Sequence, residues 1–188
     1  MSVEIIRTER LVLREIDPDI DAGFIFELLN TPKFIKYIGD REVRSEDQAT
    51  AFIENRYRQM YYDHGYGLYT VTLREDGTPA LGSRQIGVCG FVKRETLPDA
   101  DLGFAFLPKY EGKGYGFESA HAVLNYGRKT LGLTRVLAIT TLDNDASVRL
   151  LEKLGFQFDK IIESGEESLK LFRSEPGPEF SAQHTCSG

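Results

Sequence analysis

Alternating apolar and polar residues mark the strands expected in this chain. The alternation is clear at Arg10–Ile16, which ends at the turn signal Asp17-Pro18. Gly67–Arg74 is rich in β-branched and aromatic residues, and Arg84–Lys93 is expected to pair with it across a turn at Glu75-Asp76-Gly77. Later strands are predicted at Ala100–Leu107, Arg135–Leu142, Phe156–Ile162 and Glu167–Phe172.

Apolar residues three and four positions apart predict the helices. The predicted helices are Asp19–Ile38 with a break at Thr31 and Pro32, Ser45 to about Asp63, Phe117–Gly132, and Asp145–Leu154. Ser45 is a favourable N-cap because Gln48 follows three residues later, and Gly155 is expected to end the last helix. A strand–helix–strand crossover makes Asp101–Leu107 and Arg135–Leu142 parallel, whereas the earlier strands pair antiparallel.

Length and composition narrow the choice of fold and partner. The 188 residues are 41% hydrophobic, which is enough for one α+β domain with a core and short for two domains. We expect that domain at residues 1–174 and a disordered tail at 175–188, which is polar and rich in Pro, Gly and Ser. The net charge of −6 argues against binding to nucleic acid or acidic membranes and fits a cationic substrate better.

Neither the two cysteines nor the apolar segments predict a metal site, a disulfide or a membrane segment. Cys89 and Cys186 lie far apart without a Cys/His cluster, so neither a disulfide framework nor a metal site is predicted. Cys89 lies in an apolar run and is expected to be a small core residue. No segment reaches signal-peptide character or the length of about 18 apolar residues that a membrane span needs. We therefore expect a soluble, cytoplasmic protein.

A glycine-rich turn lies within Ala105–Gly116. It follows an apolar run and a proline, and its glycines are Gly112, Gly114 and Gly116. A helical pattern begins directly afterwards at Phe117, so several backbone N–H groups at the helix start lack intrahelical partners. Such a turn is a favourable seat for a phosphate, and Lys113 adds a positive charge. A tight strand–helix connection without a ligand is the alternative interpretation.

Two common phosphate-binding fingerprints do not describe this turn. The loop of nucleotide hydrolases needs Gly-Lys followed by Ser or Thr, and the dinucleotide fingerprint needs an acidic residue about 20 positions later. The turn instead resembles the pyrophosphate loop of the GNAT superfamily of N-acetyltransferases, Gln/Arg-x-x-Gly-x-Gly/Ala, from which it departs only at Glu111. The resemblance implies that the pyrophosphate of acetyl-coenzyme A (acetyl-CoA) is held at Glu111, Gly112, Lys113, Gly114, Tyr115 and Gly116, chiefly by main-chain amides.

Further segments carry the same resemblance from Thr8 to about Phe172. Asn144-x-x-Ser147 before EKLGF is similar to the family's segment after the second parallel strand. The opening TERLVLRE resembles the RimJ/RimL-like branch, which includes enzymes that acetylate N-terminal amines of ribosomal proteins. The resemblance implies a mixed, mostly antiparallel sheet of about six or seven strands with helices on both faces. Its two parallel strands would splay apart at a bulge, which Gly103 could mark.

The resemblance also implies roles for residues around that gap. The arm of coenzyme A would lie in it, pairing with main-chain groups of Phe106 and Leu107 and braced by Asn144. Asp101 would accept the amine proton through water, and a solvated strand-end aspartate is its alternative reading. Ser147 would donate a proton to the departing thiolate, or be merely a serine at a helix start. Residues that could line the acceptor site, if they are not core, are Tyr57, Tyr61 and Tyr62.

The expected activity is direct transfer of an acetyl group from acetyl-CoA to a primary amine. No histidine forms a nucleophile–base set, so an acyl-enzyme is not expected. An α-amine with a pKa near ~8 is easier to deprotonate than a lysine near ~10.4, which favours a protein N-terminus over a side chain. Small-molecule amines stay open, as do a monomer or a homodimer. A non-catalytic module that binds coenzyme A and a nucleotide-binding protein of unrelated fold are the alternatives.

Overall fold

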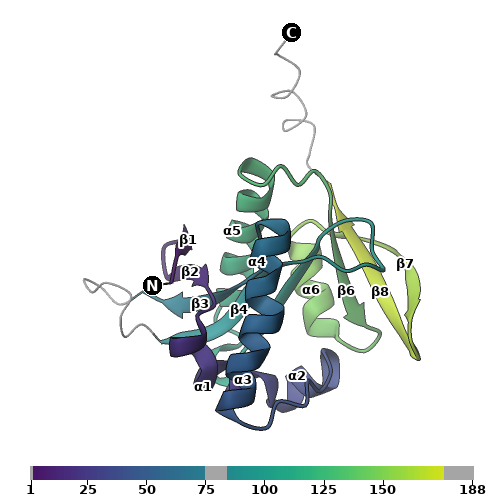
Figure 1. Ribbon diagram of the computed structural model, residues 1–188. Helices are drawn as coiled ribbons and strands as arrows, with labels where there is room; N and C mark the ends of the chain where they lie inside the picture. The colour runs from purple at the N-terminus through teal and green to yellow at the C-terminus, as the bar shows by residue number, and fades with distance from the viewer. Residues whose placement is uncertain (1, 75–83, 176–188) are drawn as a thin grey trace.

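The strands predicted from the alternating pattern join into one sheet in a computed structural model that describes residues 2–74 and 84–175 (Figure 1). The strands are β1 Glu4–Arg7, β2 Leu11–Glu15, β3 Leu68–Leu73, β4 Gln85–Val92, β5 Asp101–Phe106, β6 Val136–Thr141, β7 Gln157–Ser164 and β8 Glu167–Ser174. Their order is β1-β2-β3-β4-β5-β6-β8-β7, and only β5 and β6 run parallel. This confirms the mixed, mostly antiparallel sheet. The short edge strand β1, which was not predicted, makes it eight-stranded.

Helices cover both faces of the sheet (Figure 1). They are α1 Pro18–Leu29, α2 Pro32–Tyr37, α3 Glu46–Phe52, α4 Gln59–His64, α5 Tyr115–Lys129 and α6 Asp145–Lys153. The first four lie on one face, and α5 and α6 lie on the other. A π-helical stretch, Ile53–Arg58, joins α3 to α4, so the predicted second helix is continuous but not purely α-helical. No helix within the described ranges has the length and apolar character of a membrane span.

Local capping explains where the N-terminal helices begin. The Thr31 side chain accepts a hydrogen bond from the Phe34 N–H, and Pro32 occupies the first turn of α2, which confirms the predicted break. Ser45 likewise accepts from the Gln48 N–H at 3.2 Å. After α6, Gly155 adopts a φ of +89°, the left-handed conformation expected of a residue that ends a helix.

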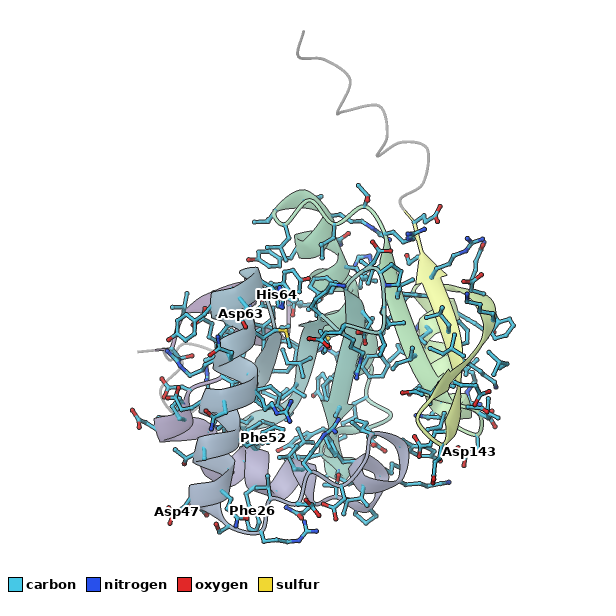
Figure 2. All side chains as sticks on the ribbon, turned by 45° about the vertical axis from the view of Figure 1, so that its right-hand side comes forward. Phe26, Asp47, Phe52, Asp63, His64 and Asp143 are labelled. Carbon is cyan, nitrogen blue, oxygen red and sulfur yellow. The ribbon has the colours of Figure 1, made fainter. Side chains whose placement is uncertain are left out.

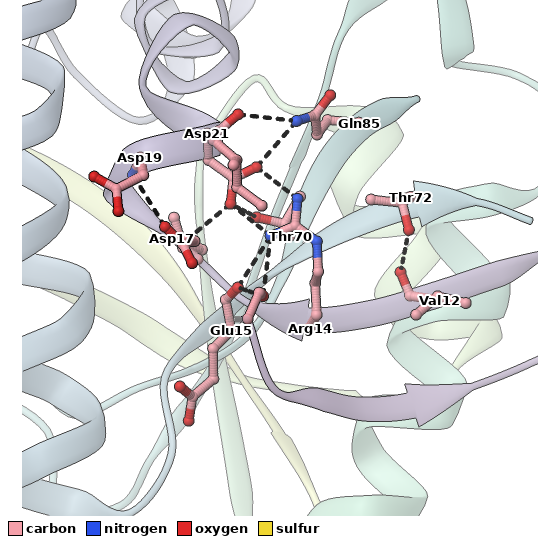
Figure 3. A network of polar contacts seen from close by, with 12 residues as sticks. Val12, Arg14, Glu15, Asp17, Asp19, Asp21, Thr70, Thr72 and Gln85 are labelled. Atoms are coloured by element: carbon pink, nitrogen blue, oxygen red, sulfur yellow. Dashed lines mark hydrogen bonds and ion pairs between the residues drawn. The ribbon is translucent and has the colours of Figure 1, made fainter. Parts of the chain in front are cut away.

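A buried ion pair fixes α1 to the sheet (Figure 3). The Arg14 guanidinium donates to both carboxylate oxygens of Asp21 at 2.7 Å, and the two side chains are almost fully buried. Thr70 and Gln85 each donate to Asp21 at 3.1 Å, from β3 and β4. Because every oxygen of this carboxylate is hydrogen-bonded, the charge is tolerated and α1 is held in one register across three strands.

Of the three tyrosines in the second helical segment, Tyr57 and Tyr61 have structural roles and Tyr62 is exposed to solvent. Tyr57 is 9% exposed, and burial raises its pKa above the ordinary value. The Tyr61 hydroxyl accepts from the Ile16 N–H at 3.0 Å and donates to the Leu68 carbonyl, which bridges β2 and β3 where they part. Tyr62 is 70% exposed.

Cys89 is a buried core residue, as predicted. The predicted turn at residues 75–77 and the tail beyond 175 lie outside the described residues.

Candidate functional site

The parallel strands β5 and β6 separate after a single contact. Asp101 pairs with Leu137, whose N–H donates to the Ala100 carbonyl at 2.9 Å, and the two strands have no further paired positions. Beyond that point β5 pairs only with β4, and β6 only with β8. The expected gap therefore opens toward Phe106 and Thr141, the carboxyl ends of the two strands.

The predicted bulge at Gly103 is wrong. The register of β5 against β4 is continuous, and Gly103 lies directly opposite Gly90. A Cβ on Gly103 would lie 3.2 Å from a Leu68 methyl carbon and 3.4 Å from Val92. The glycine therefore gives room to neighbouring side chains, and the strands separate without an extra residue.

Main-chain groups line both edges of this gap. The Leu107 N–H donates to the Ile86 carbonyl at 2.9 Å, and its own carbonyl accepts from Tyr110, so both groups are used within the protein. In an antiparallel pair the direction of the hydrogen bonds alternates, so Phe104 and Phe106 direct their N–H and C=O groups away from β4, into the gap. The same alternation against β8 directs Ile139 and Thr141 of β6 toward β5. The residue types at these positions do not indicate which main-chain groups face the gap; only the pairing register of the strands does.

The glycine turn leaves its amides free of partners in the described parts of the chain. Gly112 and Gly114 adopt φ values of +71° and +82°, which glycine reaches without strain. Gly114 is the N-cap of α5, and no side chain caps it. The N–H groups of residues 112–117 donate no hydrogen bond to any described residue; the first donor is Glu118, to the Gly114 carbonyl at 3.0 Å. Six successive amides are therefore available at a helix N-terminus.

A brace from the N-terminal segment holds this turn. Glu118 accepts hydrogen bonds from the Thr8 hydroxyl at 2.7 Å and from the Arg10 N–H and Nε at 2.9 and 2.6 Å. Arg10 also donates to the Lys113 carbonyl at 3.0 Å and lies over the Tyr115 ring at 4.6 Å. Burial acts to raise the pKa of Glu118, but these hydrogen bonds outweigh it and lower the pKa. These contacts of Thr8 and Arg10 hold the turn against the segment that leads into β2.

Helix α2 contacts both sides of the gap. Lys33 forms an ion pair with Glu111, in the turn after β5. Lys36 forms another with Asp143, after β6, at 3.0 Å. Asp143 lies at the lower right of the molecule in Figure 2 and follows β6, which ends at Thr141. Glu111, the residue that departs from the family pattern, thus has its charge balanced by a lysine from a distant segment.

The predicted proton-transfer residues flank the gap from opposite faces. Asp101 is 1% exposed, so it is not a solvated strand-end residue; it accepts from Arg94 Nε at 3.1 and 3.3 Å. Burial raises its pKa, although Arg94 opposes the shift. On the other face, Asn144 caps α6 by accepting from the Ser147 N–H at 3.3 Å. The Ser147 hydroxyl is half-buried and makes no hydrogen bond to a described residue.

A pocket of about 290 Å³ adjoins Asp101 on its own face of the sheet. Its apolar floor includes Leu97, Leu137 and Leu171, each less than 10% exposed. Its charged lining residues are Arg94, Arg135, Lys160, Arg173, Asp159 and Glu163. Basic side chains therefore outnumber acidic ones. Arg94 links the pocket to Asp101, and Leu137 pairs directly with Asp101.

A parallel strand pair that opens beside a helix start with free amides is an arrangement suited to an elongated, phosphate-bearing ligand. Residues 10–157 match the family model described as the acetyltransferase (GNAT) domain. The chain therefore belongs to the GNAT family of acetyltransferases.

Two relatives and one solved structure are similar to this chain to different extents. The uncharacterized N-acetyltransferase YoaA of Bacillus subtilis strain 168 is 31% identical over 158 residues, covering 84% of this chain and 85% of that protein. The ribosomal protein uS5-alanine N-acetyltransferase of Escherichia coli K12 is 35% identical over 74 residues, or 38% of each chain. The ribosomal L7/L12 α-N-protein acetyltransferase RimL, solved with coenzyme A, is similar in fold, with a TM-score of 0.76 at 15% identity over 92% of this chain and 97% of that chain.

Proposed function

We propose that this chain transfers the acetyl group of acetyl-CoA to a primary α-amine by direct attack. The observation that carries the proposal is the run of six amides, residues 112–117, that have no partner among the described residues beside the opening of β5 and β6. A diphosphate is the part of acetyl-CoA that such a helix start accommodates. The RimL structure solved with coenzyme A has the same fold and supports this donor.

The donor would lie along the gap in an extended form. Its diphosphate would accept hydrogen bonds from the turn amides, and its amide-bearing arm would pair with the main-chain groups of Phe104 and Phe106 as an extra strand does. On the other edge, Ile139 and the N–H of Thr141 offer groups of the same kind, whereas the Thr141 carbonyl accepts from the Asn144 N–H at 3.3 Å. This assignment includes Phe104 and omits Leu107, whose main-chain groups are bonded within the protein.

The amine would approach from the face that carries Asp101. Its nitrogen forms a bond to the thioester carbon, and the carbon–sulfur bond then breaks to release the thiolate of coenzyme A. The proton lost by the amine passes to Asp101, directly or through water, because a carboxylate with a raised pKa is a better base. The thiolate regains a proton from Ser147 on the opposite face, or from a water that its hydroxyl orients.

The pocket favours an α-amine over a polyamine. A polyamine carries several positive charges, whereas the basic residues of this pocket outnumber its acidic ones. The apolar floor suits the first side chains of a peptide instead. The uS5-alanine N-acetyltransferase, which is similar over part of this chain, supports a protein N-terminus as the acceptor.

Thiol release measured with a panel of amines, followed by mass spectrometry of the products, tests this function. We expect release with peptides that have free N-termini and a product heavier by one acetyl group on the α-nitrogen. Binding of acetyl-CoA without thiol release from any amine would favour a non-catalytic coenzyme A module. Efficient release with spermidine but not with peptides would contradict the acceptor class.

Ser147→Ala is expected to lower kcat roughly 10²-fold, the lower end of what general acid catalysis contributes, while the Kd for acetyl-CoA stays unchanged. The substitution removes the hydroxyl but leaves Asn144 to cap α6, so the helix should stay intact. Stopped-flow measurement of thiol release, with isothermal titration of acetyl-CoA, checks both quantities. An unchanged kcat would remove Ser147 from the mechanism.

Lys33→Ala is expected to weaken acetyl-CoA binding roughly two- to fivefold, because it leaves the Glu111 carboxylate unbalanced beside the phosphate seat. Adding Glu111→Gln should restore the affinity, and raising the salt concentration should shrink the difference. Lys129→Ala, an exposed change at the other end of α5, is the matched control. If the double variant binds as weakly as Lys33→Ala, the pair has no such role.

A further inference from the structure

Two exposed cations line the pocket that adjoins Asp101. Arg173 lies on β8 and Lys160 on β7, and both side chains are exposed to solvent. Neither of them forms an ion pair or a side-chain hydrogen bond with any residue that the structure describes. Side chains alternate along β8, so Arg173 shares a face with Leu171, which forms part of the pocket floor. Both cations are therefore available to a ligand in the pocket.

The other two basic side chains of the pocket already have acidic partners. Arg94 Nε lies 3.1 Å from a carboxylate oxygen of Asp101, and Arg135 Nε lies 2.7 Å from one of Asp99. The hydrogen bond to Asp99 raises the pKa of Arg135, and the negative charge of Asp159, which also lines the pocket, adds to this shift. These charges balance one another and leave the cations of β7 and β8 uncompensated.

Glu163, the second acidic residue at the pocket, directs its carboxylate to the opposite face of the sheet. The Ser168 hydroxyl lies 2.9 Å from each of its two oxygens and donates to them. Side chains alternate along β8, so Ser168 shares a face with Phe172 of the main core, whereas Leu171 faces the pocket. The pocket therefore stays cationic on the side formed by β7 and β8.

A row of paired residues gives the distance between Asp101 and Arg173. Asp101 pairs with Leu137 across β5 and β6, and Leu137 pairs with Arg173 across β6 and β8. Neighbouring strands lie about 4.8 Å apart, so Arg173 lies about 10 Å from Asp101 across the sheet. An extended peptide advances about 3.3 Å per residue and would cover that distance in about three residues.

We propose that this pocket selects peptide acceptors with a glutamate or aspartate among their first four residues, and that Arg173 and Lys160 determine this specificity. The inference rests on the proposed function, because it places the α-amine of the acceptor at Asp101. From there the peptide would cross the apolar floor toward β8 and bring its carboxylate to the two cations. An arginine can bind a carboxylate through two parallel hydrogen bonds, whereas a lysine of the acceptor would be repelled.

Acetylation of hexapeptide amides tests the proposal. One series carries a single glutamate at position two, three, four or six, and matched peptides carry alanine or lysine there. With the wild type, glutamate at one of positions two to four should raise kcat/KM roughly three- to tenfold over alanine, and glutamate at position six should change it little. Arg173→Glu should reverse the order and favour lysine over glutamate. Each protein is compared with itself, so a general loss of activity does not affect these ratios.

Lys170→Ala is the matched control. Lys170 lies on β8 between Leu169 and Leu171, so its side chain faces away from the pocket, and its loss should leave the preference for glutamate unchanged. The double variant Arg173→Ala with Lys160→Ala should lose that preference.

Three results would overturn the proposal. They are equal kcat/KM for glutamate and alanine peptides in the wild type, a preference that survives the double variant, and faster acetylation of free glutamate than of any peptide. Absence of turnover with every peptide would instead overturn the proposed function on which the proposal rests, and this result is distinct from turnover without a preference.

Discussion

Gly114→Val is expected to weaken acetyl-CoA binding roughly 100- to 10,000-fold. Gly114 has a φ of +82° and begins α5, so a branched side chain strains the turn and covers its amides. If two hydrogen bonds to the diphosphate are lost, each worth about 1.5–3 kcal/mol, the affinity falls by that range. Isothermal titration of acetyl-CoA measures the loss.

Gly132→Val provides the matched control. Gly132 follows α5, has a φ of +69° and has nothing within 4 Å of an added Cβ, so the backbone strain is similar. The two variants should lose similar amounts of thermal stability, and only Gly114→Val should lose the ligand. Wild-type affinity in Gly114→Val would show that the diphosphate does not lie on this turn.

Asp101→Asn is expected to lower kcat roughly 10²- to 10⁴-fold with little change in the Kd for acetyl-CoA. Burial raises the pKa of Asp101, so the wild-type rate should fall with acidification through two ionisations, those of Asp101 and of the amine. The variant should retain only the ionisation of the amine. A kinetic pH profile of both proteins with one peptide acceptor makes the comparison.

Asp101→Asn should lose activity but gain stability relative to the wild type as the pH rises from acid to neutral. A carboxyl group whose pKa is higher in the folded state stabilises the fold at low pH, and this contribution is lost as the pH rises through the folded pKa. The variant avoids that loss, so its stability relative to wild type should increase from acid to neutral pH. Asp47→Asn, on the exposed first turn of α3, is the control for activity. A fully active Asp101→Asn would exclude Asp101 as the base.

Local patterns were sufficient for most elements of this fold. The break between α1 and α2 follows from a threonine cap and a proline, both visible in the sequence. The splay of β5 and β6 was expected from the family resemblance, and the structure confirms it. Strand β1 was missed because its four residues, EIIR, carry too short a pattern to separate a strand from a loop.

Features that depend on distant segments could not be predicted. Arg14 lies in an alternating strand pattern, and nothing local indicates that its charge is buried against Asp21. Gly103 suggested a bulge, but its role depends on the Leu68 side chain from another strand. The free amides of the turn were expected from its glycines, whereas the Arg10 brace that holds them joins residues more than one hundred positions apart. The roles of Asp101 and Ser147 stay predictions until the variants are measured.

The measurement that tests this account most directly is a titration of coenzyme A into protein labelled with ¹⁵N-glycine. The amide resonances of Gly112, Gly114 and Gly116 should shift most, because their N–H groups would gain the diphosphate as acceptor. Those of Gly132, Gly155 and Gly165, which also have positive φ but lie elsewhere, should stay in place. Shifts confined to other glycines, or the same response to NAD as to coenzyme A, would contradict the assignment of this turn as the seat of the acetyl donor.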